Sequence, residues 1–277
     1  MEYVRLNNGL KIPKLGFGTF RLKDEECTAA VAGAIECGYR LIDTAEAYGN
    51  EAAVGEGIRR SGIDRSELFV VTKINFTSFE HPKETIENSF RNLGTDYIDL
   101  MLIHWPFGNY YAAWREMEKY YADGRIRAIG VSNFEPSQLV DLIGYNKVKP
   151  VINQVETNLY CQKGYERTWM NKYHVAHMAY APLGQGKNND MFKEPIVQIL
   201  AEKYGKTPVQ IALRFLVQRD IVAIPMSRSK EHVIQNLDVF DFTLTDYDMA
   251  ELEKLDKGPA FARHSNDPER VEWSLTI

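Results

Sequence analysis

The sequence has few cysteines, and they are not arranged to crosslink the chain or to hold a metal. Three cysteines occur among 277 residues, without a Cys-x-x-Cys pair or a mixed Cys/His metal spacing. Cys27 and Cys37 are expected on one helix, too many turns apart for a disulfide. His174 and His177 fall in a strand-like run, where this separation points their side chains to opposite faces. We therefore expect no metal site, and we interpret both histidines as strand residues with local partners.

Long apolar runs and runs of positive charge are also missing. No apolar stretch approaches the roughly 20 residues of a membrane span. Met1 leads directly into a hairpin-like segment, without the basic and apolar regions of a signal peptide. The formal net charge is −5 and no basic run exceeds a few residues, so no nucleic-acid partner is expected. These absences favour a cytoplasmic protein without membrane association, and we expect a monomer.

The chain does have enough apolar residues, 44% of the total, for a sizeable core. Its length of 277 residues fits one large α/β domain or two small ones. Because no linker and no low-complexity segment interrupts it, we expect a single domain over residues 1–277.

Short strands and helices alternate after an N-terminal hairpin. The hairpin is expected at residues 3–14, where Asn7-Asn8-Gly9 joins two short runs, since Asn-Gly is a strong turn signal. Strand-like runs follow at 15–20, 40–43, 68–73, 97–104, 126–133, 150–156, 175–184 and 221–227. Helical patterns occur at 24–37, 50–60, 82–93, 110–122, 136–143, 162–172, 195–204, 208–218, 230–236 and 245–255.

This order favours an α/β fold of the (β/α)8 TIM barrel type, whose usual size is about 250 residues. The strands are rich in Val, Ile and Leu, as expected when both faces are buried. The competing fold, a doubly wound open sheet, would carry a Gly-x-Gly-x-x-Gly turn after its first strand, and GFGTF lacks the third glycine. We expect the hairpin to plug one end of the barrel. The tail from Gly258 onward has no clear period and is expected to wrap over one rim.

Hydrogen-bonding or aromatic residues stand at the end of every expected strand. They are Gly18-Thr19-Phe20, Asp43 with Tyr48, Lys73, His104 with Trp105, Ser132-Asn133, Gln154, Tyr180, and Ser227 with Arg228. Each alone is more often a helix cap, a rim aromatic or a solvated charge. In a barrel, however, the C-terminal ends of all the strands surround one site, which is where barrel enzymes place their catalytic groups.

Four of these residues make a set with acid–base chemistry. The phenol of Tyr48, with an ordinary pKa of about 10, donates a proton poorly near neutrality unless a cation such as Lys73 stabilises the phenolate. A buried Lys73 in turn needs a carboxylate such as Asp43 to stay charged. A neutral His104 can orient a carbonyl oxygen beside the phenol. Such a set is suited to reducing or enolising a carbonyl.

A redox reaction would require a cofactor, because the set contains no source of hydride. Asn133 and Gln154 could bind a carboxamide, and Tyr180 could stack against a flat ring. These are the two demands that a nicotinamide makes.

Segments along essentially the whole chain resemble the successive signatures of the aldo-keto reductases. They are LIDTAEAYGNE, the lysine of VVTK, the histidine of LIHWP, GVSNF, NQVE, AYAPLGQG and IPMSRSKEHVIQN. The resemblance implies a barrel enzyme that reduces aldehydes and ketones (small carbonyls, α-dicarbonyls or keto-sugars) with a nicotinamide cofactor. The short loops and the ending RHSNDPERVEW are most similar to the bacterial diketogluconate reductase branch.

The resemblance also implies the roles of the site residues. Tyr48 would be the general acid, tuned by Lys73 and Asp43, while His104 would orient the substrate. The implied cofactor-binding residues are Gly18 and Thr19; Ser132, Asn133 and Gln154 on the carboxamide; Tyr180 on the ring; Leu183, Gly184 and Gln185 along the pyrophosphate; and Ser227, Arg228, His232, Gln235 and Asn236 at the adenosine end. Phe20, Phe76 and Trp105 would wall the substrate pocket.

One departure from the family pattern concerns the choice between NADPH and NADH. Family members that use NADPH usually carry lysine where this chain has Met226 and arginine where it has His232, and these two cations bind the 2′-phosphate. Arg228 and Lys230 lie in the same loop and could replace them, because a guanidinium suits phosphate well. We expect NADPH as the cofactor, with NADH also usable.

Two other functions fit part of the pattern. A Schiff-base aldolase could use Lys73 as its nucleophile, and a nucleotide-sensing barrel could keep the same residues with negligible turnover. Borohydride trapping with a carbonyl substrate would support the aldolase, whereas activity that depends on added NADPH or NADH would not. The absence of an added interaction domain argues against the sensing barrel, and we favour the reductase.

Overall fold

A computed structural model of the chain describes residues 1–186, 188–258, 261 and 264–277. The N-terminal hairpin pairs β1 (Tyr3–Arg5) with β2 (Lys11–Pro13) in antiparallel fashion. A parallel sheet follows, in the order β10-β9-β8-β7-β6-β5-β4-β3. Its strands are β3 (Phe17–Gly18), β4 (Leu41–Asp43), β5 (Phe69–Ile74), β6 (Leu100–Ile103), β7 (Ile129–Ser132), β8 (Ile152–Glu156), β9 (Ala176–Tyr180) and β10 (Val222–Ala223).

Hydrogen bonds join the two ends of this sheet and close it into a barrel. The backbone N–H of Ala223 donates to the carbonyl of Lys14 at 2.8 Å, and that of Gly16 donates to the carbonyl of Ala223 at 2.9 Å. Leu15 and Ala223 form a parallel bridge at the same place. The predicted (β/α)8 barrel is confirmed, and the open sheet is excluded.

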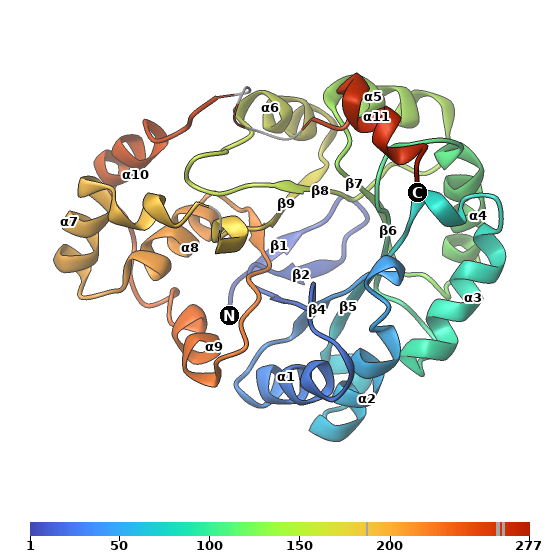
Figure 1. Cartoon of the computed structure of the whole chain (residues 1–277), viewed down its shortest axis with the longest axis horizontal. Coiled ribbons are helices and arrows are strands. Elements are labelled where there is room, and N and C mark those ends of the chain that lie inside the picture. Colours follow the sequence, from blue (N-terminus) through green and yellow to red (C-terminus); the bar gives the residue numbers. More distant parts are fainter. Residues whose placement is uncertain (187, 259–260, 262–263) are drawn as a thin grey trace.

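Helices cover the outside of the ring of strands, as Figure 1 shows. They are α1 (Asp24–Glu36), α2 (Glu51–Ser61), α3 (Pro82–Leu93), α4 (Tyr110–Ala122), α5 (Pro136–Tyr145), α6 (Gly164–Tyr173), α7 (Pro195–Tyr204), α8 (Pro208–Gln218), α9 (Lys230–Leu237), α10 (Asp246–Glu253) and α11 (Pro268–Ser274). Short 3₁₀ helices are η1 (Glu46–Tyr48), η2 (Arg65–Glu67), η3 (Phe76–Ser78), η4 (Gly184–Gly186) and η5 (Asn189–Lys193). Several helices begin with proline, whose fixed φ suits the first helical position. Among the described residues, no helix has the length and apolar character needed to cross a bilayer.

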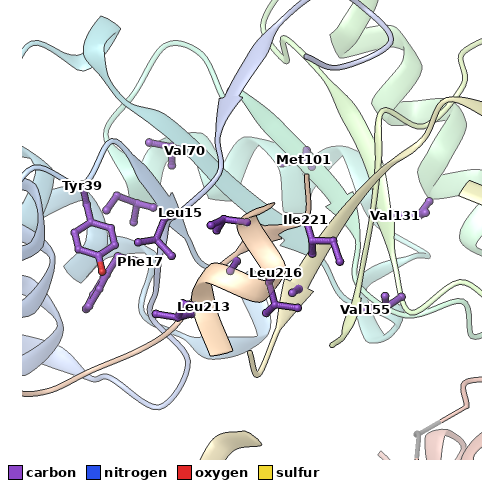
Figure 2. Packing of buried hydrophobic residues seen from close by; sticks show 14 of the residues in the cluster. Leu15, Phe17, Tyr39, Val70, Met101, Val131, Val155, Leu213, Leu216 and Ile221 are labelled. Atoms are coloured by element: carbon purple, nitrogen blue, oxygen red, sulfur yellow. The ribbon is translucent and has the colours of Figure 1, made fainter. Parts of the chain in front are cut away.

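The core has two layers, because successive side chains of a strand point to opposite faces. The inner layer fills the barrel and consists of Leu41, Phe69, Val71, Leu100, Leu102, Ala128, Val151, Ile152, Met178, Val222 and Ile224 together with Leu6 and Ile12 of the hairpin. The hairpin therefore plugs the N-terminal end of the barrel, as predicted, and it crosses the centre of the ring in Figure 1. The outer layer lies between strands and helices; Figure 2 shows part of it, with Val70, Met101, Val131 and Val155 from the strands and Leu213 and Leu216 from α8.

The C-terminal tail folds back across the opposite rim. The backbone N–H of Ser265 donates to Oε1 of Glu135 at 3.3 Å, and Nδ1 of His264 lies 3.0 Å from the same oxygen. Beyond this anchor, α11, which overlaps α5 in the view of Figure 1, brings the ring of Trp273 within 6.3 Å of the ring of Phe76. The predicted placement of the tail over one rim is confirmed, although the helix within it was not predicted.

The predicted helices agree with the observed ones within two residues at each end, whereas most strands are shorter than the apolar runs. The run at 221–227, for example, pairs as β10 over Val222–Ala223 alone. One histidine prediction is wrong. His174 ends α6 in a left-handed conformation with φ of 58°, because the helix continues to Tyr173. His177 does lie in a strand, buried in β9, with Nε2 2.8 Å from Oγ1 of Thr157.

Candidate active site

The inward-facing side chains change from apolar to polar at the C-terminal end of three neighbouring strands. Leu41, Val71 and Leu102 belong to the inner core layer. Because side chains alternate along a strand, the residue two positions later faces the same interior. Those residues are Asp43, Lys73 and His104. The barrel therefore places the three predicted residues around one opening.

Asp43 and Lys73 form a buried ion pair at the base of this opening. Nζ of Lys73 lies 2.6 Å from Oδ1 of Asp43 and also donates to the carbonyl of Thr44 at 2.7 Å. Nε2 of Gln154 donates to the other carboxylate oxygen at 2.8 Å. Lys73 is 0% exposed and Asp43 is 2% exposed. Burial raises the pKa of Asp43 and lowers that of Lys73, and the opposite charge of each partner counters these shifts.

Tyr48 stands beside this pair on η1. Nζ of Lys73 lies 5.2 Å from the centroid of the Tyr48 ring, and the ring centroids of Tyr48 and His104 are 5.7 Å apart. Burial, followed by the charge of Asp43, raises the pKa of Tyr48 well above its ordinary value. The phenol therefore carries its proton at neutral pH. The ammonium of Lys73 acts in the opposite direction, because a nearby cation stabilises a phenolate.

His104 is a neutral imidazole in this environment. Burial and the positive charge of Lys73 hold the pKa of His104 well below its ordinary value. Its Nδ1 is buried and has no hydrogen-bond partner among the described residues. Its backbone carbonyl accepts a hydrogen bond from Nδ2 of Asn133 at 3.0 Å. A neutral ring keeps one donor nitrogen and one acceptor nitrogen, so it can orient a carbonyl oxygen without adding charge.

Amide and hydroxyl groups from β7, β8 and β9 form a network next to the charged set. Nδ2 of Asn133 donates to Oγ of Ser132 at 3.0 Å, and its Oδ1 accepts from the hydroxyl of Tyr180 at 2.9 Å. Oγ of Ser132 donates to the carbonyl of Gln154 at 2.8 Å. Asn133 has a φ of 63°, an unusual conformation for a residue other than glycine. These donors, acceptors and the Tyr180 ring have the chemistry needed to bind a carboxamide on a flat ring.

Three residues predicted to bind the cofactor have partners inside the barrel wall. Oγ1 of Thr19 is fully buried and donates to the backbone carbonyl of Asp43 at 3.0 Å. Gln154, 1% exposed, uses its amide N–H on the Asp43 carboxylate. Gly18 lies against the last strand, where an added Cβ would come within 3.0 Å of the carbonyl of Ile224. These contacts fix the strand ends on which the outer residues stand.

The residues predicted for the pyrophosphate and adenosine lie at the rim. Gln185 is exposed on η4, next to Leu183 and Gly184. The segment from Ser227 to Asn236 contains the loop after β10 and most of α9, and it includes exposed His232, partly buried Gln235 and buried Asn236. Arg228 reaches back from this loop to the start of α1. Its Nε donates to Oε1 of Glu26 at 2.7 Å and its Nη2 to the carbonyl of Arg21 at 3.0 Å.

Aromatic rings surround the charged set on the outer side. The ring centroids of Phe20 and Tyr48 are 5.0 Å apart, and those of Phe76 and Phe107 are 5.4 Å apart. Trp105 stacks on Phe107 at 5.6 Å. The structure therefore brings together the three predicted pocket residues, Phe20, Phe76 and Trp105. It adds Phe107, which follows Trp105 closely in the sequence, and two residues of α11, whose segment gave no periodic signal. Trp273 lies beside Phe76, and Cζ of Arg270 lies 4.7 Å from the centroid of the Trp105 ring.

A separate group of possible metal-ligating residues lies at the anchor of the tail. Single ligand atoms of Glu135, Glu166 and His264 are within 4.8 Å of one another. Nζ of Lys163 lies 2.9 Å from Glu166, and His264 contacts Glu135. Both carboxylates therefore already face a nitrogen of the protein, and the contacts of His264 and Ser265 attach the tail to the start of α5.

Comparison with known proteins identifies the family. Residues 14–257 match the model of the Aldo/keto reductase family. The chain belongs to this family. It is 41% identical to morphine 6-dehydrogenase of Pseudomonas putida, over 98% of this chain and 96% of that protein. It is 38% identical to methylglyoxal reductase DkgA of Escherichia coli, over 92% of this chain and 94% of that protein, which confirms the predicted likeness to the diketogluconate reductase branch.

Solved structures of aldo-keto reductases have the same fold as this chain. An aldo-keto reductase from a Medee basin deep-sea metagenome library has a TM-score of 0.92 and 40% identity, covering 96% of this chain and 99% of that one. The aldose reductase of Schistosoma japonicum has a TM-score of 0.87 and 31% identity, covering 94% and 93%. The protein is thus an enzyme, an oxidoreductase that reduces carbonyl compounds with a nicotinamide cofactor. The predicted family, fold and reaction class are confirmed.

Proposed function

We propose that Tyr48 delivers the proton when this reductase converts an aldehyde or ketone to an alcohol. The observation that supports this assignment is the meeting of a protonated phenol, a buried ammonium and a neutral imidazole at one opening, with Lys73 5.2 Å from the Tyr48 ring. A bound nicotinamide cofactor supplies the hydride. The residues of the chain position the substrate and supply the proton.

Asp43, Lys73 and Tyr48 act in sequence on the proton. Asp43 holds Lys73 in its charged form through the 2.6 Å contact. As the proton leaves the hydroxyl of Tyr48 for the carbonyl oxygen, the phenolate develops beside the ammonium, and their attraction lowers the barrier. General acid catalysis of this kind contributes about 10²–10⁴-fold to a rate.

His104 and the aromatic residues position the substrate. The donor nitrogen of the neutral His104 ring orients the carbonyl oxygen towards Tyr48. Phe20, Phe76 and Trp105 form the wall around it, and their apolar surfaces exclude water, which strengthens the charge interactions inside. An apolar wall with one polar corner suits small carbonyls, α-dicarbonyls and keto-sugars. The names of two relatives, a methylglyoxal reductase and a morphine 6-dehydrogenase, are compatible with this range.

The cofactor of this proposal is NADPH, with NADH also accepted. Ser132, Asn133 and Gln154 would hold its carboxamide, Tyr180 would stack on its ring, and the segment from Leu183 to Gln185 would bind its pyrophosphate. At the adenosine end the chain has Arg228 and exposed Lys230 where a 2′-phosphate needs positive charge. Because Met226 and His232 replace the cations usual in the family, the preference for NADPH is modest.

The remaining assignments belong to the same proposal. The enzyme works as a monomer of one domain, residues 1–277, in the cytoplasm, on a small-molecule carbonyl and without a nucleic-acid partner. The net charge of −5 supports the last point, because binding to a polyanion calls for clustered positive charge.

A turnover assay tests the function. The purified protein is incubated with NADPH or NADH and a panel of aldehydes, α-dicarbonyls and keto-sugars, and oxidation of the cofactor is followed together with formation of the alcohol. We expect reduction of at least one class with both cofactors. Substrate trapped on Lys73 by borohydride, without dependence on a cofactor, would instead identify an aldolase. Cofactor binding with negligible turnover across the panel would support the sensing subunit.

A further inference from the structure

Arg228, which the proposed function places near the adenosine 2′-phosphate, already has a carboxylate partner. Its Nε lies 2.7 Å from Oε1 of Glu26, a residue 202 positions earlier in the chain. The side chains of Arg228 and Glu26 are 52% and 49% exposed, so the pair forms in contact with solvent. Nη2 of Arg228 is held by the carbonyl of Arg21. The guanidinium thus joins the loop before α9 to the loop before α1.

We infer that Glu26 is a residue that determines cofactor selectivity, because it competes with the 2′-phosphate of NADPH for Arg228. This inference rests on the proposed function. A phosphate and a carboxylate present similar paired oxygen atoms to a guanidinium. The phosphate must therefore displace Glu26 from Nε or share Arg228 with it. NADH has a hydroxyl at that position and encounters no such competition.

The charges around Arg228 also disfavour a 2′-phosphate. The first turn of α1 contains Asp24, Glu25 and Glu26. Glu25 is paired with Arg60 of α2, with Nη2 2.9 Å from Oε2. Glu26 is the member of the three that reaches the α9 loop. A negative group there both occupies the cation and repels an incoming dianion, so both effects lower affinity for a 2′-phosphate and leave the binding of NADH unchanged.

The exposure of the pair makes the exchange feasible. Ion pairs between exposed side chains are weak, so the phosphate does not have to break a strong contact. A buried pair such as Asp43–Lys73 could not exchange in this way. Glu26 therefore adjusts the preference between cofactors and does not exclude NADPH.

The test measures binding of two adenosine probes by calorimetry, without turnover. Adenosine 2′,5′-bisphosphate carries the 2′-phosphate, and adenosine 5′-monophosphate lacks it. Glu26→Gln keeps the length and polarity of the side chain but removes its charge. We expect this variant to bind the bisphosphate about three- to tenfold more tightly, as removal of a weak competing ion pair and a nearby like charge allows, and the monophosphate within about twofold of the parent.

Glu25→Gln is the matched control, because it removes the same charge from the same helical turn but frees Arg60 instead of Arg228. Its ratio of affinities for the two probes should stay within about twofold of the parent. A second control repeats Glu26→Gln in an Arg228→Ala background. There the gain in affinity for the bisphosphate should shrink, because the cation that Glu26 occupies is gone. The inference would be overturned if Glu26→Gln raised the affinity for the bisphosphate equally in both backgrounds. It would also be overturned if the ratio of affinities for the two probes were the same in Glu26→Gln as in Glu25→Gln.

The remaining outcomes separate this inference from the proposed function. If Arg228→Ala leaves the ratio of affinities unchanged while NADPH-dependent reduction continues, the phosphate is bound elsewhere. The inference about Glu26 is then wrong and the reductase activity stands. If no carbonyl is reduced with either cofactor, the proposed function fails independently of the probe affinities.

Discussion

The two charged regions of the active site differ in how their charges are held. At the base of the opening, Lys73 and Asp43 are 0% and 2% exposed, and their polar atoms contact each other, Thr44 and Gln154. At the rim, the side chains of Arg228 and Glu26 are about half exposed, at 52% and 49%. The first pair has fixed partners inside the protein, whereas the second can exchange partners with solvent or ligand.

This difference follows from the fold. Barrel strands place side chains at two-residue intervals on a rigid wall, so a charge at the strand end is surrounded by the packed interior and cannot move away. The rim consists of loops, where charges are screened by water and salt. The buried region is therefore suited to catalysis, which needs a fixed geometry, and the rim to selectivity, which needs small adjustable energies. The effects of substitutions in the two regions should therefore differ in magnitude and in their dependence on salt.

The largest effect is expected for Tyr48→Phe, which removes the proposed proton donor and keeps the ring. We predict that kcat falls by about 10²–10⁴-fold, the usual contribution of general acid catalysis, while cofactor affinity stays close to that of the parent. Steady-state kinetics and a cofactor titration measure the two quantities. Tyr39→Phe is the control, because it removes another buried phenol, whose hydroxyl donates to the carbonyl of Val233 on α9 and contacts none of the four proposed catalytic residues. Retention of more than about a tenth of kcat would contradict the role of Tyr48.

Lys73→Met is expected to affect both activity and folding. Breaking a buried pair by removing one partner costs about 3–5 kcal/mol of unfolding free energy, because Asp43 is left without its cation. In protein that remains folded, the apparent pKa of the catalytic acid should rise and kcat should fall. Urea unfolding and a pH–rate profile measure these effects. Lys193→Met, which breaks the exposed pair with Asp190, should cost less than about 1 kcal/mol. An unchanged pH–rate profile in folded Lys73→Met would refute the tuning role.

Much of the buried region could be predicted from the sequence. The sequence predicted that Asp43, Lys73 and His104 stand at the ends of successive strands around one site, and the structure shows that each stands two positions after an inward-facing apolar residue. The prediction was weaker for Gln154. Its position was found, but its contact with Asp43 depends on how closely β4 and β8 approach across the barrel interior, which the sequence does not contain.

The rim was less predictable for a physical reason. Arg228 was identified as the available cation, but its partner Glu26 lies 202 residues away on a helix surface with several acids. Nothing in the local pattern distinguishes Glu26 from Glu25. The tail gave a similar result: an Asp-Pro pair begins α11, yet the contact of Trp273 with Phe76 depends on where the preceding segment is anchored.

A third prediction extends the comparison to a buried histidine outside the site. Burial, and then the charge of Arg167, lowers the pKa of His177 to about 3. Between pH 6.5 and this value the unfolded chain binds a proton that the folded chain does not, so stability falls as pH decreases. This group should remove about 2 kcal/mol of unfolding free energy between pH 6.5 and 4.5.

Urea unfolding at pH 7 and pH 4.5 measures that loss. In His177→Gln the loss of unfolding free energy between pH 7 and pH 4.5 should be smaller than in the parent by about 2.5 kcal/mol. The control His232→Gln removes an exposed histidine from the rim and should keep the difference of the parent. If His177→Gln loses as much stability in acid as the parent does, the buried imidazole does not control the acid response.

The smallest effect is expected at the rim, where Met226→Lys combined with His232→Arg restores the cations usual in the family. The two positions flank Arg228, and His232 is exposed. Each new contact with a 2′-phosphate should therefore contribute only about as much as an exposed charge pair, and the two together should widen the NADPH preference by about tenfold. The ratio of kcat/KM for NADPH to that for NADH measures this change.

The salt dependence separates the rim from the buried region. Because the Debye length shortens from about 30 Å at 0.01 M salt to about 8 Å at 0.15 M, the gain in NADPH preference should shrink as salt is added. The loss of kcat in Tyr48→Phe should not change with salt. If the gain in NADPH preference does not depend on salt, the new side chains act by packing against the adenosine. The distinction between a fixed interior and an exchangeable rim would then not hold for cofactor choice.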